Sequence, residues 1–158
     1  MIIALTILGE PASKANSREL ATIGPKDDRR TILRKSEKAL AYERDALRQI
    51  PPRARVRMQG PVRVTLRIWY ASERPDLDES IVLDVLQDRW GRSKPQNPIV
   101  PGQRVLVQSG VYRNDRQVRE KHVFWALDRH NPRAEIEVEP LHAQQVELLE
   151  PEEAALPF

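Results

Sequence analysis

The alternation of apolar and polar residues predicts the most regular strand of the chain at residues 62–70. Its even-numbered positions, from Val62 to Tyr70, are all apolar or aromatic, and its odd-numbered positions read Arg, Thr, Arg and Trp. Successive side chains of a strand point to opposite faces, so this pattern indicates a strand buried on one side. Shorter apolar runs predict further strands at residues 2–8, 105–108, 117–127 and 134–139.

Two segments have helical rather than alternating spacing. Residues 31–50 place Leu33, Leu40 and Leu47 on one side and most of their basic residues elsewhere, which predicts an amphipathic helix with a cationic face. The run "SIVLDVLQDRW", residues 80–90, is apolar over a broader stripe and predicts a buried helix.

The segments between these elements are predicted to be loops. Residues 12–30 are polar, contain Gly24-Pro25 and show no apolar period, so we expect a long mobile loop there. Residues 91–103 are rich in Pro and Gly and predict a second loop.

This order of elements predicts an α+β fold, with a single-layer mixed β-sheet flanked by two main helices. The chain has 158 residues, the length of one ordinary domain with a core of its own. We expect that domain to span residues 1–141 and residues 142–158 to form a flexible acidic tail without a core.

Composition excludes several kinds of site. The chain has no cysteine and three histidines, which rules out disulfides and thiolate metal sites and argues against a histidine zinc site. Any bound metal must therefore be held by oxygen ligands. The apolar start "MIIALTILG" lacks a basic segment and is too short for a signal peptide or a membrane span, so we expect a cytoplasmic protein without a membrane partner.

Charge is distributed unevenly along the chain. All 26 Lys and Arg residues lie at or before Arg133 together with 16 of the 23 acidic residues, so the body carries a net charge of +10 and the remainder −7. A basic body favours a polyanionic partner, because clustered Lys and Arg release counterions from phosphates. The alternative is an ordinary solvated surface of mixed charge.

The segment "RPDLDES", residues 74–80, places Asp76 and Asp78 between the regular strand and the apolar helix. Two carboxylates about 4 Å apart repel by roughly 4 kcal/mol at an effective dielectric of about 20, unless a cation, a proton or solvent relieves them. One interpretation is a helix cap, either a capping box from Asp76 to Glu79 or an N-cap at Asp78. The other is a magnesium site, because residues i and i+2 of extended backbone point the same way.

A third acid lies in "GVYRNDRQV", residues 110–118, where Asp115 falls between two predicted strands. If the fold brings it to the first two, the case for a metal site is stronger. Asn114-Asp115 is also ordinary turn chemistry, so a simple hairpin is the competing interpretation.

The order of a strand, "PDLD", an apolar helix and "GVYRNDRQV" resembles the RusA family of Holliday junction resolvases, often carried by phages and prophages. In that family Asp-x-Asp opens a helix, and an acidic pair precedes Gln-Val. Asp76 and Asp78 match the first motif, and Asp115 matches the acid of the second. "GEPASKANS" near the start resembles the first loop of the family, and the likeness runs from about residue 4 to about residue 140.

The resemblance implies a homodimeric, Mg²⁺-dependent crossover junction endonuclease, with Mn²⁺ as a substitute, that nicks two opposed strands of a four-way DNA junction. Asp76, Asp78 and Asp115 would be the catalytic metal ligands. The lysine that the family places one helical turn after the second Asp is Val82 here, and Lys121 is the candidate replacement. Eight residues of the first loop and the following helix are the candidate DNA contacts: Lys14, Asn16, Arg18, Lys26, Arg29, Arg30, Arg34 and Lys38.

Two alternatives stay open at this point. The chain can be a flap-cutting or branched-DNA-binding relative of the family, or a non-catalytic DNA-binding module whose acids only cap and turn. Within the tail, "QVELL" at residues 145–149 and the terminal "EAALPF" resemble peptides that dock on the bacterial sliding clamp, against the simpler interpretation of a solubilising tail.

Overall fold

The computed structural model describes residues 1–13, 16–93 and 103–142. Ten strands and helices follow one another along the chain: β1 (Ile3–Leu8), β2 (Arg18–Ile23), β3 (Arg30–Lys35), α1 (Glu37–Gln49), β4 (Val62–Tyr70), α2 (Ser80–Leu86), β5 (Arg89–Arg92), β6 (Arg104–Gln108), β7 (Val118–Leu127) and β8 (Arg133–Pro140). Among the described residues, short 3₁₀ turns lie at Pro52–Ala54 and Asp115–Gln117. The predicted α+β class is confirmed.

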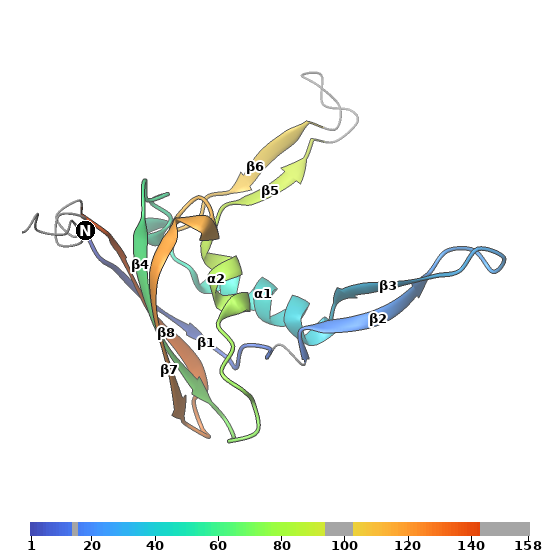
Figure 1. Ribbon diagram of the computed structural model, residues 1–158, viewed down its shortest axis with the longest axis horizontal. Helices are drawn as coiled ribbons and strands as arrows, with labels where there is room; N and C mark the ends of the chain where they lie inside the picture. The colour runs from blue at the N-terminus through green and yellow to red at the C-terminus, as the bar shows by residue number, and fades with distance from the viewer. Residues whose placement is uncertain (14–15, 94–102, 143–158) are drawn as a thin grey trace, which may run out of the picture.

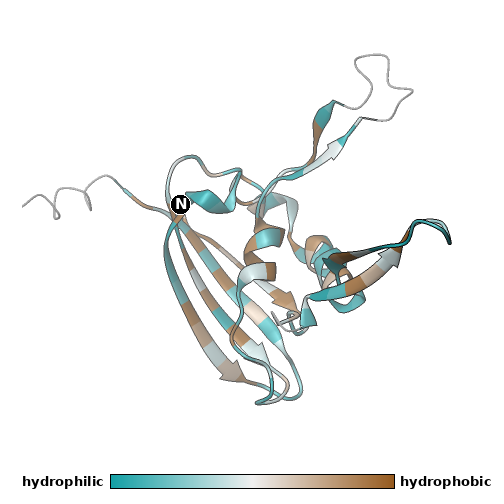
Figure 2. Ribbon diagram, turned by 45° about the vertical axis from the view of Figure 1, so that its right-hand side comes forward, coloured by the Kyte–Doolittle hydropathy of each residue, from teal (hydrophilic) through white to brown (hydrophobic). Residues whose placement is uncertain are grey.

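The main sheet has four strands in the order β1-β8-β4-β7, and it is mixed because β4 runs parallel to β7 and antiparallel to β8. Both helices lie on one side of this sheet (Figure 1). The even-numbered residues of β4 are fully buried in the core, as the alternation predicted. Alternating apolar and polar bands along the strands of this sheet are visible in Figure 2.

Helix α1 begins at Glu37, later than the predicted start at residue 31, because Ser36 caps it. The Ser36 hydroxyl accepts a hydrogen bond from the backbone N–H of Ala39 at 3.1 Å and donates one to the carbonyl of Asn16 at 2.5 Å. An N-cap residue has extended backbone, so the helix cannot continue toward residue 31. The helix buries Ala39, Tyr42 and Ala46 against the core.

The prediction of a loop over residues 12–30 and of a helix from residue 31 was wrong in part, because residues 18–35 form the antiparallel hairpin β2–β3. This hairpin extends away from the body (Figure 1), and most of its side chains are exposed. No apolar period marks it because it packs on no core. Gly24 starts its turn with a φ of +106°, and a Cβ atom there would lie 2.3 Å from the Asp28 carbonyl oxygen.

The predicted helix over residues 80–90 is shorter than expected, since α2 ends at Leu86 and the chain continues into the hairpin β5–β6. The predicted loop over residues 91–103 accordingly starts inside β5. Its residues 94–102 lie outside the described part of the chain, as do Lys14 and the clamp-like segments of the tail. Within the described ranges, neither helix has the length and apolar character needed to cross a membrane.

Candidate active site

The loop that carries Asp76 and Asp78 is held by Tyr70, the last residue of β4. The Tyr70 side chain is buried, and its hydroxyl accepts a hydrogen bond from the Asp78 backbone N–H and donates one to the Asp76 carbonyl, both at 3.2 Å. Trp125 of β7 stacks against Tyr70 with ring centroids 6.0 Å apart, and its indole N–H donates to the Pro75 carbonyl at 3.4 Å. The backbone of the motif is therefore fixed from two strands.

The Asp78 side chain has one satisfied oxygen and one that is not. Its Oδ1 accepts hydrogen bonds from the Ser80 backbone N–H at 3.0 Å and from the Ser80 hydroxyl. The N-cap residue of α2 is Glu79, whose side chain makes no cap bond, so the predicted N-cap at Asp78 and capping box from Asp76 to Glu79 were wrong, although Asp78 does bind the first N–H of the helix. Its Oδ2 is buried without a hydrogen-bond partner among the described residues. A buried acceptor left unpaired costs roughly 1–3 kcal/mol, and more when it is charged. The contacts with the start of α2 therefore satisfy one oxygen of this carboxylate and leave the other without a partner among the described residues.

At the second motif, the hydrogen bonds that stabilise the turn are made by the neighbours of Asp115 and not by its own carboxylate. Asn114 caps the 3₁₀ turn by accepting from the Arg116 N–H at 2.9 Å, and the Gln117 carboxamide accepts from the Asn114 N–H at 3.1 Å. The Gln117 Nε2 donates to the Met58 carbonyl at 2.9 Å. The Asp115 carboxylate makes no hydrogen bond within the described residues and faces solvent, so the simple turn interpretation does not require it.

A second acid, Asp84 of α2, lies close to Asp115 through a shared glutamine. The Asp115 backbone N–H donates to Gln87 Oε1 at 3.3 Å, and Gln87 Nε2 donates to Asp84 Oδ1 at 3.5 Å. Burial raises the pKa of Asp84, the Lys35 ammonium opposes this rise, and the Asp115 carboxylate adds to it. Asp84 and Asp115 therefore form one acidic pair at the end of α2.

A buried ion pair holds the Asp115 segment against α2. Asp88, whose side chain is 1% exposed, accepts from the Arg57 guanidinium at 2.8 Å and from the Gly110 N–H at 2.8 Å. A Cβ atom on Gly110 would lie 2.4 Å from the Leu86 carbonyl oxygen, so this close approach requires glycine. These contacts fix where the chain leaves toward Asp115.

Lys121, the predicted replacement for the family lysine, forms an ion pair with Glu79, the residue that follows Asp78. Burial is the largest influence on the Glu79 carboxyl and tends to raise its pKa, but the hydrogen bond and charge of Lys121 together with a backbone hydrogen bond outweigh it, so the pKa is lowered. Val82 is fully buried in the core, so its position offers no cation. The structure thus brings Lys121 next to the Asp78 segment.

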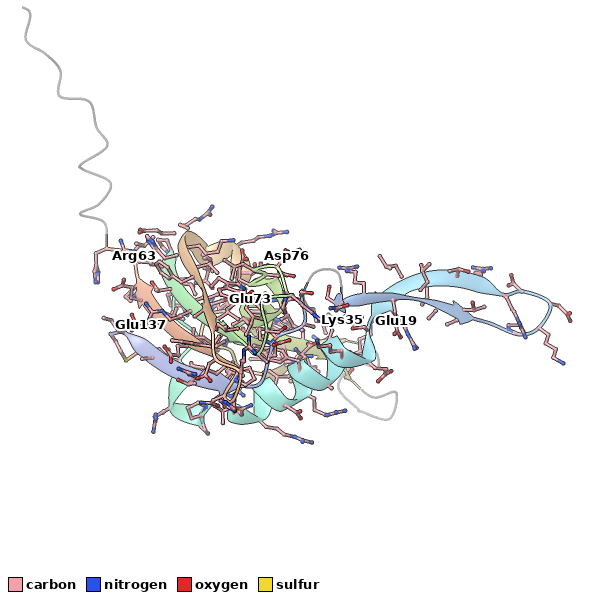
Figure 3. All side chains as sticks on the ribbon, turned by 90° about the horizontal axis from the view of Figure 1, so that it is seen from below. Glu19, Lys35, Arg63, Glu73, Asp76 and Glu137 are labelled. Atoms are coloured by element: carbon pink, nitrogen blue, oxygen red, sulfur yellow. The ribbon has the colours of Figure 1, made fainter. Side chains whose placement is uncertain are left out.

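The candidate DNA contacts fall on and beside the β2–β3 hairpin, and the acids of that region neutralise some of them. Arg34 pairs with Glu19, which Figure 3 labels on the hairpin, at 2.8 Å, and Arg30 pairs with Asp28 at 3.3 Å. Lys38 lies 3.9 Å from Glu10, and Asn16 donates to the Ser13 hydroxyl at 3.4 Å. Arg18, Lys26 and Arg29 are exposed and make no salt bridge with any described residue.

The three predicted ligands are not assembled into one ready-made cluster. Across residues 1–13, 16–93 and 103–142, no group of three or more His, Asp or Glu side chains is arranged to hold a metal ion. Mg²⁺, however, keeps several waters and often takes only one or two carboxylates with phosphate oxygens. The unpaired Asp78 Oδ2 is one hard oxygen donor of this kind, and in the described part of the chain it is not joined by two further acidic side chains in a ligand cluster.

Several residues that shape the site were missed from the sequence. Tyr70 was assigned only to the buried face of its strand, although it directly precedes the aspartate loop. Gln117 stands three residues after Asn114, a spacing typical of a capping box. No sequence signal marks Gln87 as the link between two acids that lie far apart in the chain.

No model of a known protein family matches this chain, and a search of curated proteins found no match either. The RusA resemblance therefore stays a prediction that rests on the quoted motifs. The fold and the site define an α+β protein with a buried carboxylate that lacks one partner, a neighbouring acidic pair and an exposed basic hairpin.

Proposed function

We propose that this chain is a cytoplasmic, Mg²⁺-dependent, structure-specific DNA endonuclease that resolves four-way junctions by paired nicks, with Mn²⁺ as a substitute metal. The observation that carries the proposal is the buried, unpaired Oδ2 of Asp78 at the start of α2. Helix capping leaves this oxygen unexplained, whereas a divalent cation would give it a partner.

Asp78 would hold the ion together with Asp76 and Asp115. When bound, Mg²⁺ lowers the pKa of a coordinated water and neutralises charge that develops on the phosphate. The raised pKa of Asp84, caused first by its burial, suits a carboxyl group that exchanges protons beside a phosphate. Lys121 supports the site as a positioning residue, because its ion pair balances the charge of Glu79 next to Asp78.

The β2–β3 hairpin would bind the phosphates of a DNA arm. Arg18, Lys26 and Arg29 are the strongest candidates, since they make no salt bridge with a described residue and bind phosphate without breaking one. Replacing all three by Gln should weaken junction binding and reduce the log-log salt slope by about 0.9 for each phosphate that is no longer neutralised. An unchanged slope would show that these charges face bulk solvent.

Paired nicks require two active sites, and we expect a homodimer that forms through the open face of the main sheet. This face contains a hollow of about 420 Å³ lined by Arg67, Phe124 and Glu137, among others. Arg67 lies 5.7 Å from the Phe124 ring centroid, and among the described residues neither Arg67 nor Glu137 makes a salt bridge. A two-fold contact can pair each with the other, because both partners present the same patch.

A charge exchange tests this interface. R67E and E137R should each give a monomer by analytical ultracentrifugation, whereas an equimolar mixture of the two should dimerise because opposite charges again meet. Single variants that dimerise like the parent protein would place the interface elsewhere.

The test of catalysis is the replacement of each predicted ligand by its amide. Asp76→Asn, Asp78→Asn and Asp115→Asn should each lower Mg²⁺-dependent incision of a labelled four-way junction by more than about 100-fold, since even residues that only support metal ligands cost 10–100-fold. Junction binding in EDTA should be retained. Asp45→Asn, an exposed site on α1, is the matched control and should cut at the parental rate.

Two results would change the assignment. Normal incision by all three variants would refute the metal site. Junction binding by the parent protein without incision in Mg²⁺ or Mn²⁺ would instead identify a non-catalytic, branched-DNA-binding relative. Flap and linear substrates tested in parallel separate a resolvase from a flap-cutting enzyme.

A further inference from the structure

The hairpin β5–β6 carries an exposed aromatic side chain that the core does not use. The hairpin leaves the body directly after α2 and projects from the same side as α1 and β2–β3 (Figure 1). Trp90 in its first strand is 45% exposed, and Val107 in its second strand is 68% exposed. Burying a tryptophan stabilises a fold substantially, so its exposure on a projecting hairpin points to a binding role.

The surroundings of Trp90 are cationic. The Arg104 guanidinium lies over the indole ring, 4.7 Å from its centroid. Arg92 lies directly opposite Arg104 in the register of the two strands. These residues and Gly91 line a hollow of about 550 Å³. The described residues of the hairpin, 89–93 and 103–108, include three arginines and no acid, and of these only Arg89 forms a salt bridge within the described chain.

Trp90 also borders the acidic side of the candidate active site. Together with Asp84, Gln87 and Arg89 it lines a second hollow of about 220 Å³. Gln87 connects Asp84 to Asp115 as described above. A strand whose phosphate reached these acids would therefore pass beside Trp90.

We propose that Trp90 and Arg104 form a stacking site for an unpaired nucleobase, whose neighbouring phosphates are bound by Arg92. Bases stack on aromatic rings whatever their sequence, and a guanidinium on the same ring adds a cation–π contribution. A protein partner is the less favoured occupant, because three arginines without an acid match a phosphate backbone. This inference rests on the proposed function and specifies the part of the substrate that the hairpin recognises.

An intact duplex keeps its bases stacked within the helix, so it cannot use this site without unpairing. The centre of a branched junction, a flap or a single strand can. The site therefore predicts a preference for DNA with unpaired bases near the scissile phosphate, and this preference is independent of which bases they are.

The test compares binding of oligo-dT and of a blunt duplex to the full chain in EDTA, measured by fluorescence anisotropy. Base–aromatic stacking contributes about 1–3 kcal/mol per base, so Trp90→Ala should weaken oligo-dT binding about 5- to 150-fold and leave duplex binding nearly unchanged. Trp90→Phe should retain most of the affinity. An oligonucleotide with abasic sites should bind parent and Trp90→Ala equally.

Arg104→Ala provides a second variant and should weaken oligo-dT binding by a smaller factor than Trp90→Ala. Arg48→Ala, which removes an exposed arginine of α1, is the matched control and should bind like the parent. Urea unfolding of each variant checks that the fold is intact.

Three outcomes would overturn the stacking site. The first is unchanged oligo-dT binding by Trp90→Ala. The second is an equal loss for duplex and single strand, which would assign the residue a role in phosphate binding or hairpin structure. The third is binding of neither DNA by the parent, which would favour a protein partner. Failure of catalysis is separable, because the Asp78→Asn variant should lose Mg²⁺-dependent incision and keep the preference for oligo-dT over duplex in EDTA.

Discussion

The ion pair between Asp88 and Arg57 should contribute more to stability than any surface salt bridge of this chain. Its carboxylate is 1% exposed and also accepts from the Gly110 N–H, while Arg57 is 34% exposed. Asp88→Asn keeps the shape but removes the charge. Hydrogen bonds to charged groups contribute about 1.5–3 kcal/mol, and hydration of the part-exposed Arg57 places the expected loss near the lower end.

Asp88→Ala should cost more, because it also leaves the buried Gly110 N–H unpaired. That adds the desolvation cost of a lone donor, so we expect a total loss of about 3–4 kcal/mol. At roughly 3 °C per kcal/mol for a chain of this size, the melting temperature should fall by about 5 °C for the amide and about 10 °C for the alanine.

Urea unfolding followed by tryptophan fluorescence measures both losses. Asp84→Asn is the control, since Asp84 lies one turn earlier in the chain. Burial is the first cause of the raised pKa of Asp84, so removing its charge should leave the free energy of unfolding equal to that of the parent protein or slightly higher. An Asp88→Ala midpoint equal to that of the parent protein would refute the assigned role. Asp88→Asn and Asp88→Ala should also lower incision, although Asp115 itself is unchanged, because both variants weaken the contacts that hold the segment carrying Asp115.

Three further predictions follow from single side chains. Burial tends to raise the pKa of Glu43, but the hydrogen bonds and charges of Lys35 and Arg89 together outweigh it, so the pKa is lowered. The ionised Glu43 therefore stabilises the fold above a pH of about 4.3, and this contribution is lost as the pH falls below that value. Glu43→Gln should accordingly reduce the change of the urea midpoint between about pH 6 and pH 3. Mg²⁺ at ten times its dissociation constant should stabilise the parent by about 1.4 kcal/mol in thermal unfolding, and Asp78→Asn should lose this shift. Ser36→Ala should cost about 1 kcal/mol by removing the cap of α1, whereas Ser36→Thr, whose hydroxyl can still accept from the Ala39 N–H and donate to the Asn16 carbonyl, should restore most of it.

Local patterns predicted the elements that contact the core. The alternation in β4 and the apolar stripe of α2 have a single physical cause, which is burial of one face. The strand was assigned correctly, and the helix was correct in type and start but was predicted to end four residues too late, at residue 90 rather than Leu86. The β2–β3 hairpin has no such face, because it stands clear of the core. Its sequence pattern is weaker and consists of two six-residue runs on either side of Gly24. In the structure these runs lie opposite each other, from Arg18 with Lys35 to Ile23 with Arg30.

The candidate site was predictable only where its chemistry is local. Asp76 and Asp78 drew attention because two nearby carboxylates repel each other. In the structure Asp76 is exposed and Asp78 is buried, and the cost that is visible is the burial of Asp78 Oδ2 without a hydrogen-bond partner among the described residues. The pairing of Asp84 with Asp115 depends on how α2 meets a segment some thirty residues later. Such a contact is set by tertiary packing, which no sequence window contains.

The hairpin β5–β6 is closed at its root, where Arg89 pairs with Gln108, and the chain returns to the body close to where it left. Both motifs of the candidate site lie in the single connection between β4 and β7, one on each side of this root. The rest of the protein therefore constrains only the base of this hairpin, and lengthening the hairpin beyond its base costs little loop-closure entropy. Under the proposed function, the outer part of this hairpin can be exchanged to change which DNA is selected, while the candidate site at its base is left intact.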